Sequence, residues 1–292
     1  MRRKLVLAGL VLGLCGSAIS AQNRVAEPYP NDVYCSSIVT SEAVPRDTYL
    51  ISGDQSNIRV VFNEFDHVYI NKGASQGVKV GDEFSVVRPV EETDKAEWTK
   101  WQFAILHKMG TMWEDEGRLK VVEVLPEVSI AQIEHACGYM QRADIVLPFT
   151  ERPQPPLKTV TEFNHFAPPD GKGMAMIIEG QRFQSQVGKN DFVYVNLGNN
   201  QGVKVGNYFR IFRYTGTEHE YAFQTPRYAF DMNGDLGPTY GFGGVPKKWN
   251  WNDVPREVLG EGIVLRTGPN SSTVLITFSA REIYAGDYVE LE

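Results

Sequence analysis

The sequence predicts a mainly β protein with two tandem, homologous small β-barrel or sandwich-like modules. A block of 21 residues occurs twice, as VYINKGASQGVKVGDEFSVVR at 68–88 and as VYVNLGNNQGVKVGNYFRIFR at 193–213, with 12 identical positions. Around both blocks lie short segments rich in Val and Ile, separated by Gly, Asn and Asp, as is typical of strands and turns. Repetition over this length indicates two copies of one structural unit.

The similarity between the two halves extends beyond the block. The segment 117–133 resembles 260–276 at a spacing of 143 residues, whereas 125 residues separate the two blocks. The second half therefore holds 18 additional residues, which we place in the stretch 214–256, rich in glycine and aromatic residues. Upstream of the block, 49–62 corresponds to 174–187 at the spacing of the blocks.

Residues 1–21 are typical of a secretory signal peptide, because three cations precede a short apolar run and then small residues. The apolar run is too short for a permanent membrane anchor. A lipoprotein anchored through Cys15 is not expected, since Leu14 stands where lipoprotein signals carry Gly, Ala or Ser. No later stretch is long and apolar enough for a transmembrane helix. We expect an exported protein of the periplasm or the cell envelope.

The composition excludes some classes of partner. Removal of the signal peptide takes the formal net charge from −7 to −10. An acidic chain is poorly suited to nucleic acids, whose binding depends on clustered cations that meet phosphates. The same charge argues against docking on anionic lipid.

Export would leave two cysteines, Cys35 and Cys137. An even pair in an oxidising compartment predicts a disulfide, which would tie the N-terminal segment to the first module. Two buried free thiols are the alternative.

We divide the mature chain into four parts. An extended N-terminal segment over 22–47 precedes the first β module at 48–149. A linker with five prolines follows at 150–173, and its composition predicts a stiff spacer. The second β module fills 174–292 and contains the long insertion at 214–256.

The residue types that the two blocks share are explained by folding. Asn71 ends a strand, and its short side chain can bond to nearby backbone and start a turn. Gly73 and Gly77 are expected to adopt positive φ, and Gly81 to permit a second tight turn. The second block repeats this pattern at Asn196, Gly198, Gly202 and Gly206.

The block also carries a family resemblance. NKGASQGVKVGDEF, together with the later GRLKVVEV and the terminal GDYVELE, resembles the C-terminal domain of flagellar assembly protein T and, to a smaller degree, the β-domain of rod-shape-determining protein C. The resemblance covers roughly 70 to 100 residues of each half. It implies small β-barrel modules of the bacterial envelope, which serve as structural or assembly parts. Its motif consists of turn glycines and core valines, so only fold and compartment carry over.

No motif for catalysis or for a cofactor stands out. There is no G-x-S-x-G, and the His-Glu pair at 219–220 lacks the second histidine of H-E-x-x-H. The segment 231–237 begins like a calcium loop but lacks its glycine and its bidentate glutamate. His135 and Cys137 have no second ligand pair in the sequence, so we interpret them as a surface histidine and a disulfide cysteine. We predict neither a metal nor a cofactor.

The tryptophans are the candidate binding residues. All five lie in two equivalent excursions, between the shared block and the later strands of each half. Flat aromatic rings suit partner surfaces or sugar faces, although long excursions can also need a small core of their own. In the first excursion, helical periodicity over 94–106 predicts a short helix or a hairpin arm. The tentative binding residues are Trp98, Trp101, Trp249 and Trp251.

Two function classes remain open. The first is a non-enzymatic exported envelope protein, a structural, assembly or binding module for an envelope protein or for peptidoglycan. The alternative is an exported hydrolase with a carboxylate-based site that the sequence does not reveal. A deep pocket with converging acidic residues or histidines would favour the hydrolase.

Overall fold

The fold was obtained as a computed structural model, which describes residues 26–91, 97–159, 162–214 and 255–292. Antiparallel strands form most of the regular structure in these ranges, which confirms the prediction of a mainly β protein. The predicted signal peptide and the segment with Trp249 and Trp251 lie outside the described residues.

The first half of the chain forms a seven-stranded antiparallel sheet, which we call the first sheet. Its strands are β1 (Ile38–Thr40), β2 (Leu50–Gly53), β4 (His67–Ile70), β5 (Glu83–Val90), β6 (Thr111–Val124), β7 (Ser129–Ala136) and β9 (Ile145–Pro148). Their order is β2–β4–β7–β6–β5–β9, and β1 pairs with β6 outside this path. The ends of this path approach each other, since the Leu50 N–H donates to the Asp144 carbonyl at 2.9 Å.

The second half forms a closed six-stranded barrel, which we call the closed barrel. Its strands are β10 (Met174–Gly180), β12 (Phe192–Val195), β13 (Tyr208–Arg213), β14 (Glu257–Thr267), β15 (Ser272–Ser279) and β17 (Tyr288–Leu291). Their order is β10–β12–β15–β14–β13–β17, and β17 closes the barrel by pairing with β10. Closure leaves no unpaired sheet edge.

The strand orders of the two sheets correspond strand for strand. Each sheet is also accompanied by one small two-stranded sheet. It pairs the short strand after β2 or β10 with the short strand before β9 or β17. These are β3 (Val61–Phe62) with β8 (Met140–Gln141), and β11 (Gln186–Val187) with β16 (Ile283–Tyr284). Duplication of one unit would give this correspondence; common origin of the halves stays a prediction.

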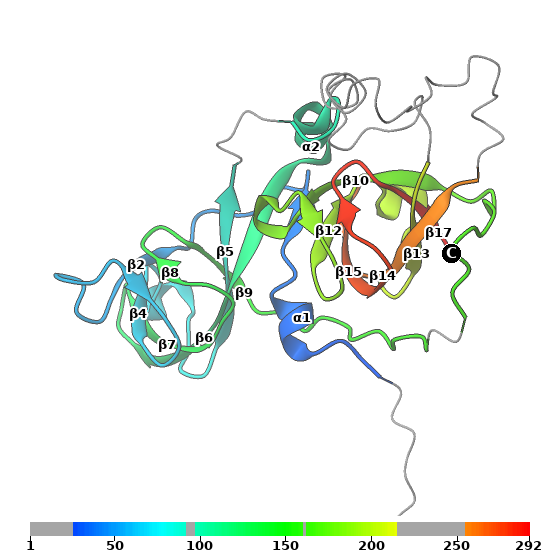
Figure 1. The fold of residues 1–292 in the computed structure, drawn as a ribbon. Helices are drawn as coiled ribbons and strands as arrows, with labels where there is room; N and C mark the ends of the chain where they lie inside the picture. Colours follow the sequence, from blue (N-terminus) through cyan, green and yellow to red (C-terminus); the bar gives the residue numbers. More distant parts are fainter. Residues whose placement is uncertain (1–25, 92–96, 160–161, 215–254) are drawn as a thin grey trace, which may run out of the picture.

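The N-terminal segment lies between the two sheets (Figure 1). We predicted an extended lead-in, but the segment contains the short helix α1 (Pro30–Tyr34) as well as β1. On one side β1 pairs with β6. On the other, the Thr273 hydroxyl donates to the Ser37 carbonyl at 2.9 Å. The segment therefore joins the first sheet to the closed barrel.

The first excursion forms part of the same junction. It contains the helix α2 (Gln102–Met109), which overlaps the segment with helical periodicity. The Gln102 side chain is buried, and its Nε2 donates to the Ile178 carbonyl of the barrel at 2.8 Å. Apolar side chains from the N-terminal segment, the excursion and the barrel form a shared core, the central cluster. Its buried members are Val39, Leu106, Met109, Met112, Ile178 and Tyr194.

The proline-rich segment 150–173 has no helix or strand in its described residues. We predicted a stiff spacer, and the structure shows that parts of it pack against the rest of the chain. Leu157 packs against a cluster of Ile263, Leu275 and neighbouring apolar residues on the closed barrel. Arg152 turns the other way, toward β6 of the first sheet.

The shared glycines have two different roles, which corrects one prediction. Gly77 and Gly81 have φ of 87° and 91°, and Gly202 and Gly206 have φ of 84° and 89°, as predicted. Gly73 instead has an extended backbone with φ of −135°. A Cβ on Gly73 would lie 2.2 Å from the Leu125 carbonyl oxygen, so this position needs glycine for close backbone approach. Gly198 has the same backbone, and its Cβ would lie 2.3 Å from the Gly268 carbonyl oxygen.

The shared asparagines also differ from the prediction. Asn71 does not bond to the turn that follows it. Its Oδ1 accepts the Tyr49 N–H at 2.7 Å, across to the chain just before β2. Asn196 accepts the Met176 N–H of β10 in the same way, at 2.8 Å. Each asparagine therefore fastens the first strand of its sheet to the shared block.

Candidate functional site

The disulfide predicted between Cys35 and Cys137 is present in the structure. The two Sγ atoms lie 2.00 Å apart, and the Cα atoms 5.4 Å apart. Cys35 ends α1 and Cys137 follows β7, so the bond fastens the N-terminal segment to the first sheet.

His135 lies beside this disulfide, which the sequence could not show. Its Nε2 is 3.5 Å from the Cys35 Sγ, and its Nδ1 is 3.3 Å from the Glu64 carboxylate. The sequence predicts an ordinary surface histidine at 135, because Cys35 is 100 residues away and no second ligand pair stands near it. The fold brings together two sulfur atoms, an imidazole and a carboxylate.

Asp115 is the centre of a buried ion cluster next to the disulfide. Arg152 donates to both carboxylate oxygens, at 2.8 and 2.9 Å, and Arg266 of the closed barrel donates to Oδ2 at 3.0 Å. The Ser37 N–H donates to the same oxygen at 2.9 Å. Burial favours the protonated carboxyl, but the two guanidinium groups outweigh burial and lower the pKa of Asp115. Asp115 thus joins the N-terminal segment, the linker and the barrel.

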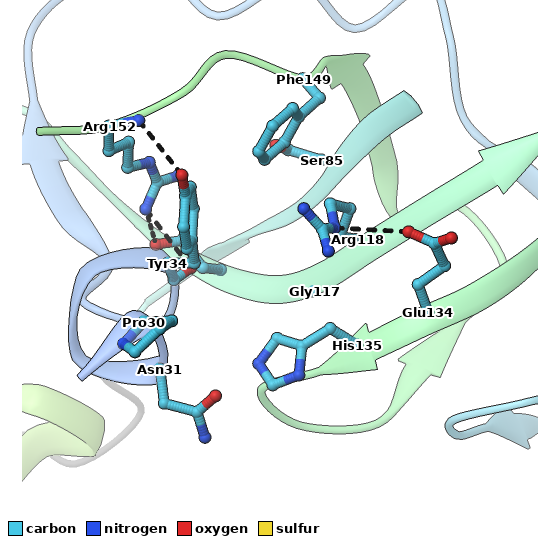
Figure 2. A pocket seen from close by; sticks show the side chains of 11 residues that line it. Pro30, Asn31, Tyr34, Ser85, Gly117, Arg118, Glu134, His135, Phe149 and Arg152 are labelled. Atoms are coloured by element: carbon cyan, nitrogen blue, oxygen red, sulfur yellow. Dashed lines mark hydrogen bonds and ion pairs between the residues drawn. The ribbon is translucent and has the colours of Figure 1, made fainter. Parts of the chain in front are cut away.

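A cavity of about 270 Å³ opens beside α1 (Figure 2). The rings of Tyr34 and Phe149 line it, with centroids 5.5 Å apart, and the Arg118 guanidinium lies over Phe149 at 5.1 Å. Glu134 and His135 contribute further polar groups. The lining therefore combines aromatic surface with charged groups of both signs, which suits a small polar ligand or a peptide side chain.

A second cavity of about 240 Å³ is lined by Glu116 and by both cysteines of the disulfide. Burial raises the pKa of Glu116 to about 7. Arg88 lies 2.8 Å away and opposes this shift, while the Asp144 carboxylate, which shares the same guanidinium, adds to it. A carboxyl group poised near neutral pH in a cavity is a candidate acid or base.

The tryptophans of the first excursion do not form one surface. Trp98 and Trp101 are 41% and 63% exposed, whereas Trp113 on β6 is 4% exposed and packs in the core. Trp101 precedes α2 with φ of 67°, a left-handed conformation that costs free energy for a residue with a Cβ. The tentative binding residues Trp98 and Trp101 are thus exposed, and Trp249 and Trp251 lie outside the described residues.

The segments that follow β2 in the first sheet and β10 in the closed barrel differ in their contacts. In the closed barrel, Phe183 packs against the central cluster and Gln181 donates to the Cys35 carbonyl at 2.9 Å. In the first sheet, the segment between β2 and β4, which contains β3 and which we call the free loop, exposes apolar side chains to solvent. They are Ile58, Val60 and Phe65, which are 76%, 70% and 74% exposed. Sequence reasoning missed this loop, because its valine and isoleucine residues are typical of a strand.

No protein-family model matches the chain, and no curated protein is significantly similar to it. Within the described ranges, no helix has the length and the apolar character that crossing a bilayer requires. The calcium-like segment and the His-Glu pair fall within 215–254, outside the described residues.

Proposed function

We propose that this chain is a non-enzymatic, exported protein of the bacterial envelope that binds a protein partner as an assembly module. The observation that carries the proposal is the contrast between Ile58 and Phe183. Each stands three residues before the short strand that follows, β3 for Ile58 and β11 for Phe183, at the spacing of 125 residues. Phe183 packs against another part of the chain, whereas Ile58 is exposed to solvent.

The loop of the closed barrel provides a precedent for the chemistry. Beside the apolar contact of Phe183, the Gln181 side chain donates to the Cys35 carbonyl, and the Arg182 guanidinium donates to the Cys137 carbonyl at 3.3 Å. Protein interfaces commonly combine a buried apolar side chain with hydrogen bonds around it. The backbone carbonyl groups of a partner protein can accept such hydrogen bonds. The equivalent loop of the first sheet has its anchor exposed.

The free loop is held in shape before any partner binds. Arg59 and Asp66 form a paired contact across it, and the Ile58 N–H donates to the Gln55 carbonyl at 2.9 Å. A loop that is already ordered loses less conformational entropy on binding. The three exposed apolar residues of this loop are therefore suited to a partner surface.

The export signal and the resemblance to flagellar assembly protein T support the envelope as compartment. The acidic charge supports a protein partner over nucleic acid or anionic lipid. Trp98 and Trp101 are the second candidate contact, since exposed aromatic residues often dominate the binding energy of interfaces.

The test compares matched triple variants. Wild type and two triple variants are immobilised and offered envelope extract. The first variant is I58S/V60S/F65S, and the control is V80S/V122S/L125S, whose residues are exposed apolar positions outside the segment between β2 and β4. Loss of an apolar anchor commonly costs about 2 kcal/mol, which is roughly 30-fold in affinity. We expect the loop variant alone to lose a saturable protein partner. Equal retention by all three chains, or selective sedimentation with purified peptidoglycan instead, contradicts the proposal.

A hydrolase is the second candidate, and Glu116 is the observation that favours it. Its pKa of about 7 would allow it to donate a proton to a leaving group at neutral pH. Purified protein would be assayed on peptidoglycan and on peptide substrates beside the variant Glu116→Gln. Activity that the variant loses would support the hydrolase, whereas equal traces of activity in both chains would point to a contaminant.

A further inference from the structure

We propose that the dithiol form of this protein binds one zinc ion through Cys35, Cys137 and His135. The ligand atoms of these three residues all lie within 4.8 Å of one another. Two thiolates and one imidazole, with water in the fourth position, are a ligand set that zinc takes in proteins. In the disulfide form the two sulfur atoms are bonded to each other, so the site exists only after reduction.

The histidine is oriented for this role. Its Nδ1 faces the Glu64 carboxylate at 3.3 Å, which places the ring proton on Nδ1. The lone pair of Nε2 then faces the Cys35 sulfur, 3.5 Å away. A metal-bound histidine almost always donates its other ring N–H to a carboxylate or a carbonyl, and this partner fixes the ring. Glu64 supplies that partner.

The distances require little rearrangement. In a tetrahedral zinc site, thiolate sulfur and imidazole nitrogen are separated by about 3.6 Å, close to the spacing seen here. The two sulfur atoms must move apart by about 2 Å once their bond is broken, because both stand about 2.3 Å from the metal. Rotation of the two cysteine side chains can supply this movement.

Solvent can reach the site from two sides. His135 lines the cavity beside α1, and both cysteines line the cavity that contains Glu116. A metal ion therefore has an entry path, and the fourth position has room for water. All three ligand residues are half-buried, which protects the ligands without closing the site.

The chemistry balances with a dithiol as reductant. The Cys35–Cys137 disulfide accepts two electrons and two protons from the external dithiol and becomes two thiols. The external dithiol is oxidised to a disulfide. Binding of the divalent cation then releases the two thiol protons, because the thiolate is the ligand. Reoxidation of the cysteines would release the metal.

The closed barrel cannot form this site, which makes the inference specific to the first sheet. At the spacing of 143 residues, Phe278 stands at the position of His135 and Ala280 at that of Cys137. The ligands therefore do not belong to the folding pattern that the two halves share.

The test uses cobalt(II) as a spectroscopic probe of the full chain. Protein reduced with a phosphine is titrated with Co²⁺, and charge-transfer absorption from thiolate to cobalt is recorded. We expect saturation at one equivalent, displacement by Zn²⁺, and no signal from the oxidised chain. Absence of the thiolate absorption in the reduced chain overturns the proposal. If reduction unfolds the chain, Co²⁺ should restore the native near-ultraviolet circular dichroism, and failure to do so overturns it equally.

Two substitutions and one control separate the site from incidental thiol binding. His135→Ala should abolish tetrahedral cobalt absorption, and Glu64→Gln should weaken binding by about tenfold, as loss of an orienting carboxylate does. His67→Ala is the matched control, because His67 also pairs with a carboxylate, Asp54, at 3.1 Å. Equal affinity in His135→Ala and His67→Ala would show that the histidine takes no part and would refute the site.

Discussion

The two halves of this molecule share a strand order but differ at the positions where they meet. On β6 the first sheet carries Asp115 and Glu116, and the corresponding residues on β14 are Val258 and Leu259, all of them buried. Asp115 contacts the N-terminal segment, the linker and the barrel. Glu116 pairs with Arg88 of the first sheet, and its counterpart Leu259 lies in the core of the barrel. The comparison teaches that the shared pattern preserves turns and core, and that the junction is built from what the halves do not share.

A buried ion pair is common to both halves. Arg88 donates through Nε to Asp144 at 2.7 Å, and Arg213 donates in the same way to Asp287 at 2.6 Å. Each aspartate also accepts a backbone N–H three residues before it, at 2.7 and 2.8 Å. These aspartates lie at the turn before the last strand of each sheet. This ion pair therefore belongs to the fold that the halves share, whereas the buried charges of Asp115 and Glu116 have apolar counterparts in the closed barrel.

The largest expected effect on stability comes from replacing Asp115 with valine, the residue at the corresponding position of the closed barrel. Asp115→Val leaves Arg152 and Arg266 without their carboxylate, and breaking such a buried cluster costs about 4 kcal/mol. Denaturant unfolding monitored by circular dichroism measures the change. Asp47→Ala is the control, because its pair with Lys72 is exposed to solvent and should contribute little to stability. Similar losses in the two variants would mean that the junction depends on packing and not on charge.

Glu116 should make the free energy of unfolding depend on pH near neutrality. Its pKa rises from 4.5 to about 7 on folding, so the folded state holds the proton more tightly than the unfolded state. The free energy of unfolding should therefore fall as pH rises from 4.5 through 7 and level off above that. The full shift corresponds to about 3 kcal/mol. Glu116→Leu, which installs the counterpart residue, should flatten this slope; an unchanged slope would assign it to other groups.

The shared glycines should separate into two classes, equally in both halves. Gly73→Ala would force a Cβ against a carbonyl oxygen and should cost about 2 to 3 kcal/mol. Gly77→Ala meets no neighbouring atom within 4 Å and should cost about 1 kcal/mol through its positive φ. Gly198→Ala and Gly202→Ala should repeat this ranking. Thermal unfolding of the four variants provides the measurement, and a reversed order in one half would break the correspondence of the repeats.

The smallest effect on stability is expected for the exposed tryptophans. Trp101→Ala should change the free energy of unfolding by less than about 0.5 kcal/mol, since its side chain is 63% exposed. Trp98→Ala should cost about 1 kcal/mol, since more than half of its side chain is covered. Acrylamide quenching should reach both residues but not Trp113. If the two variants lose partner binding but keep their stability, the exposed tryptophans of the first excursion are part of a binding surface. Unfolding of both variants would make them part of a small core instead.

Much of the fold could be predicted from local patterns. The strand segments at 68–71, 84–88, 118–124 and 129–133 follow from Val and Ile runs between turn residues, and the positive φ of Gly77 follows from its place after a short turn. The disulfide followed from the count of cysteines. The role of Gly73 could not be predicted, because it depends on a carbonyl about 50 residues away.

By itself the sequence determined that the protein is mainly β, since alternation, turn residues and repetition are properties of neighbouring residues. Only the tertiary structure decided which charges meet and which apolar side chains stay exposed. Arg152 and Arg266 reach Asp115 from segments 37 and 151 residues away, and His135 reaches Cys35 across 100 residues. Burial strengthens these contacts because it removes competing water. These residues become buried only when both sheets pack against the N-terminal segment that lies between them.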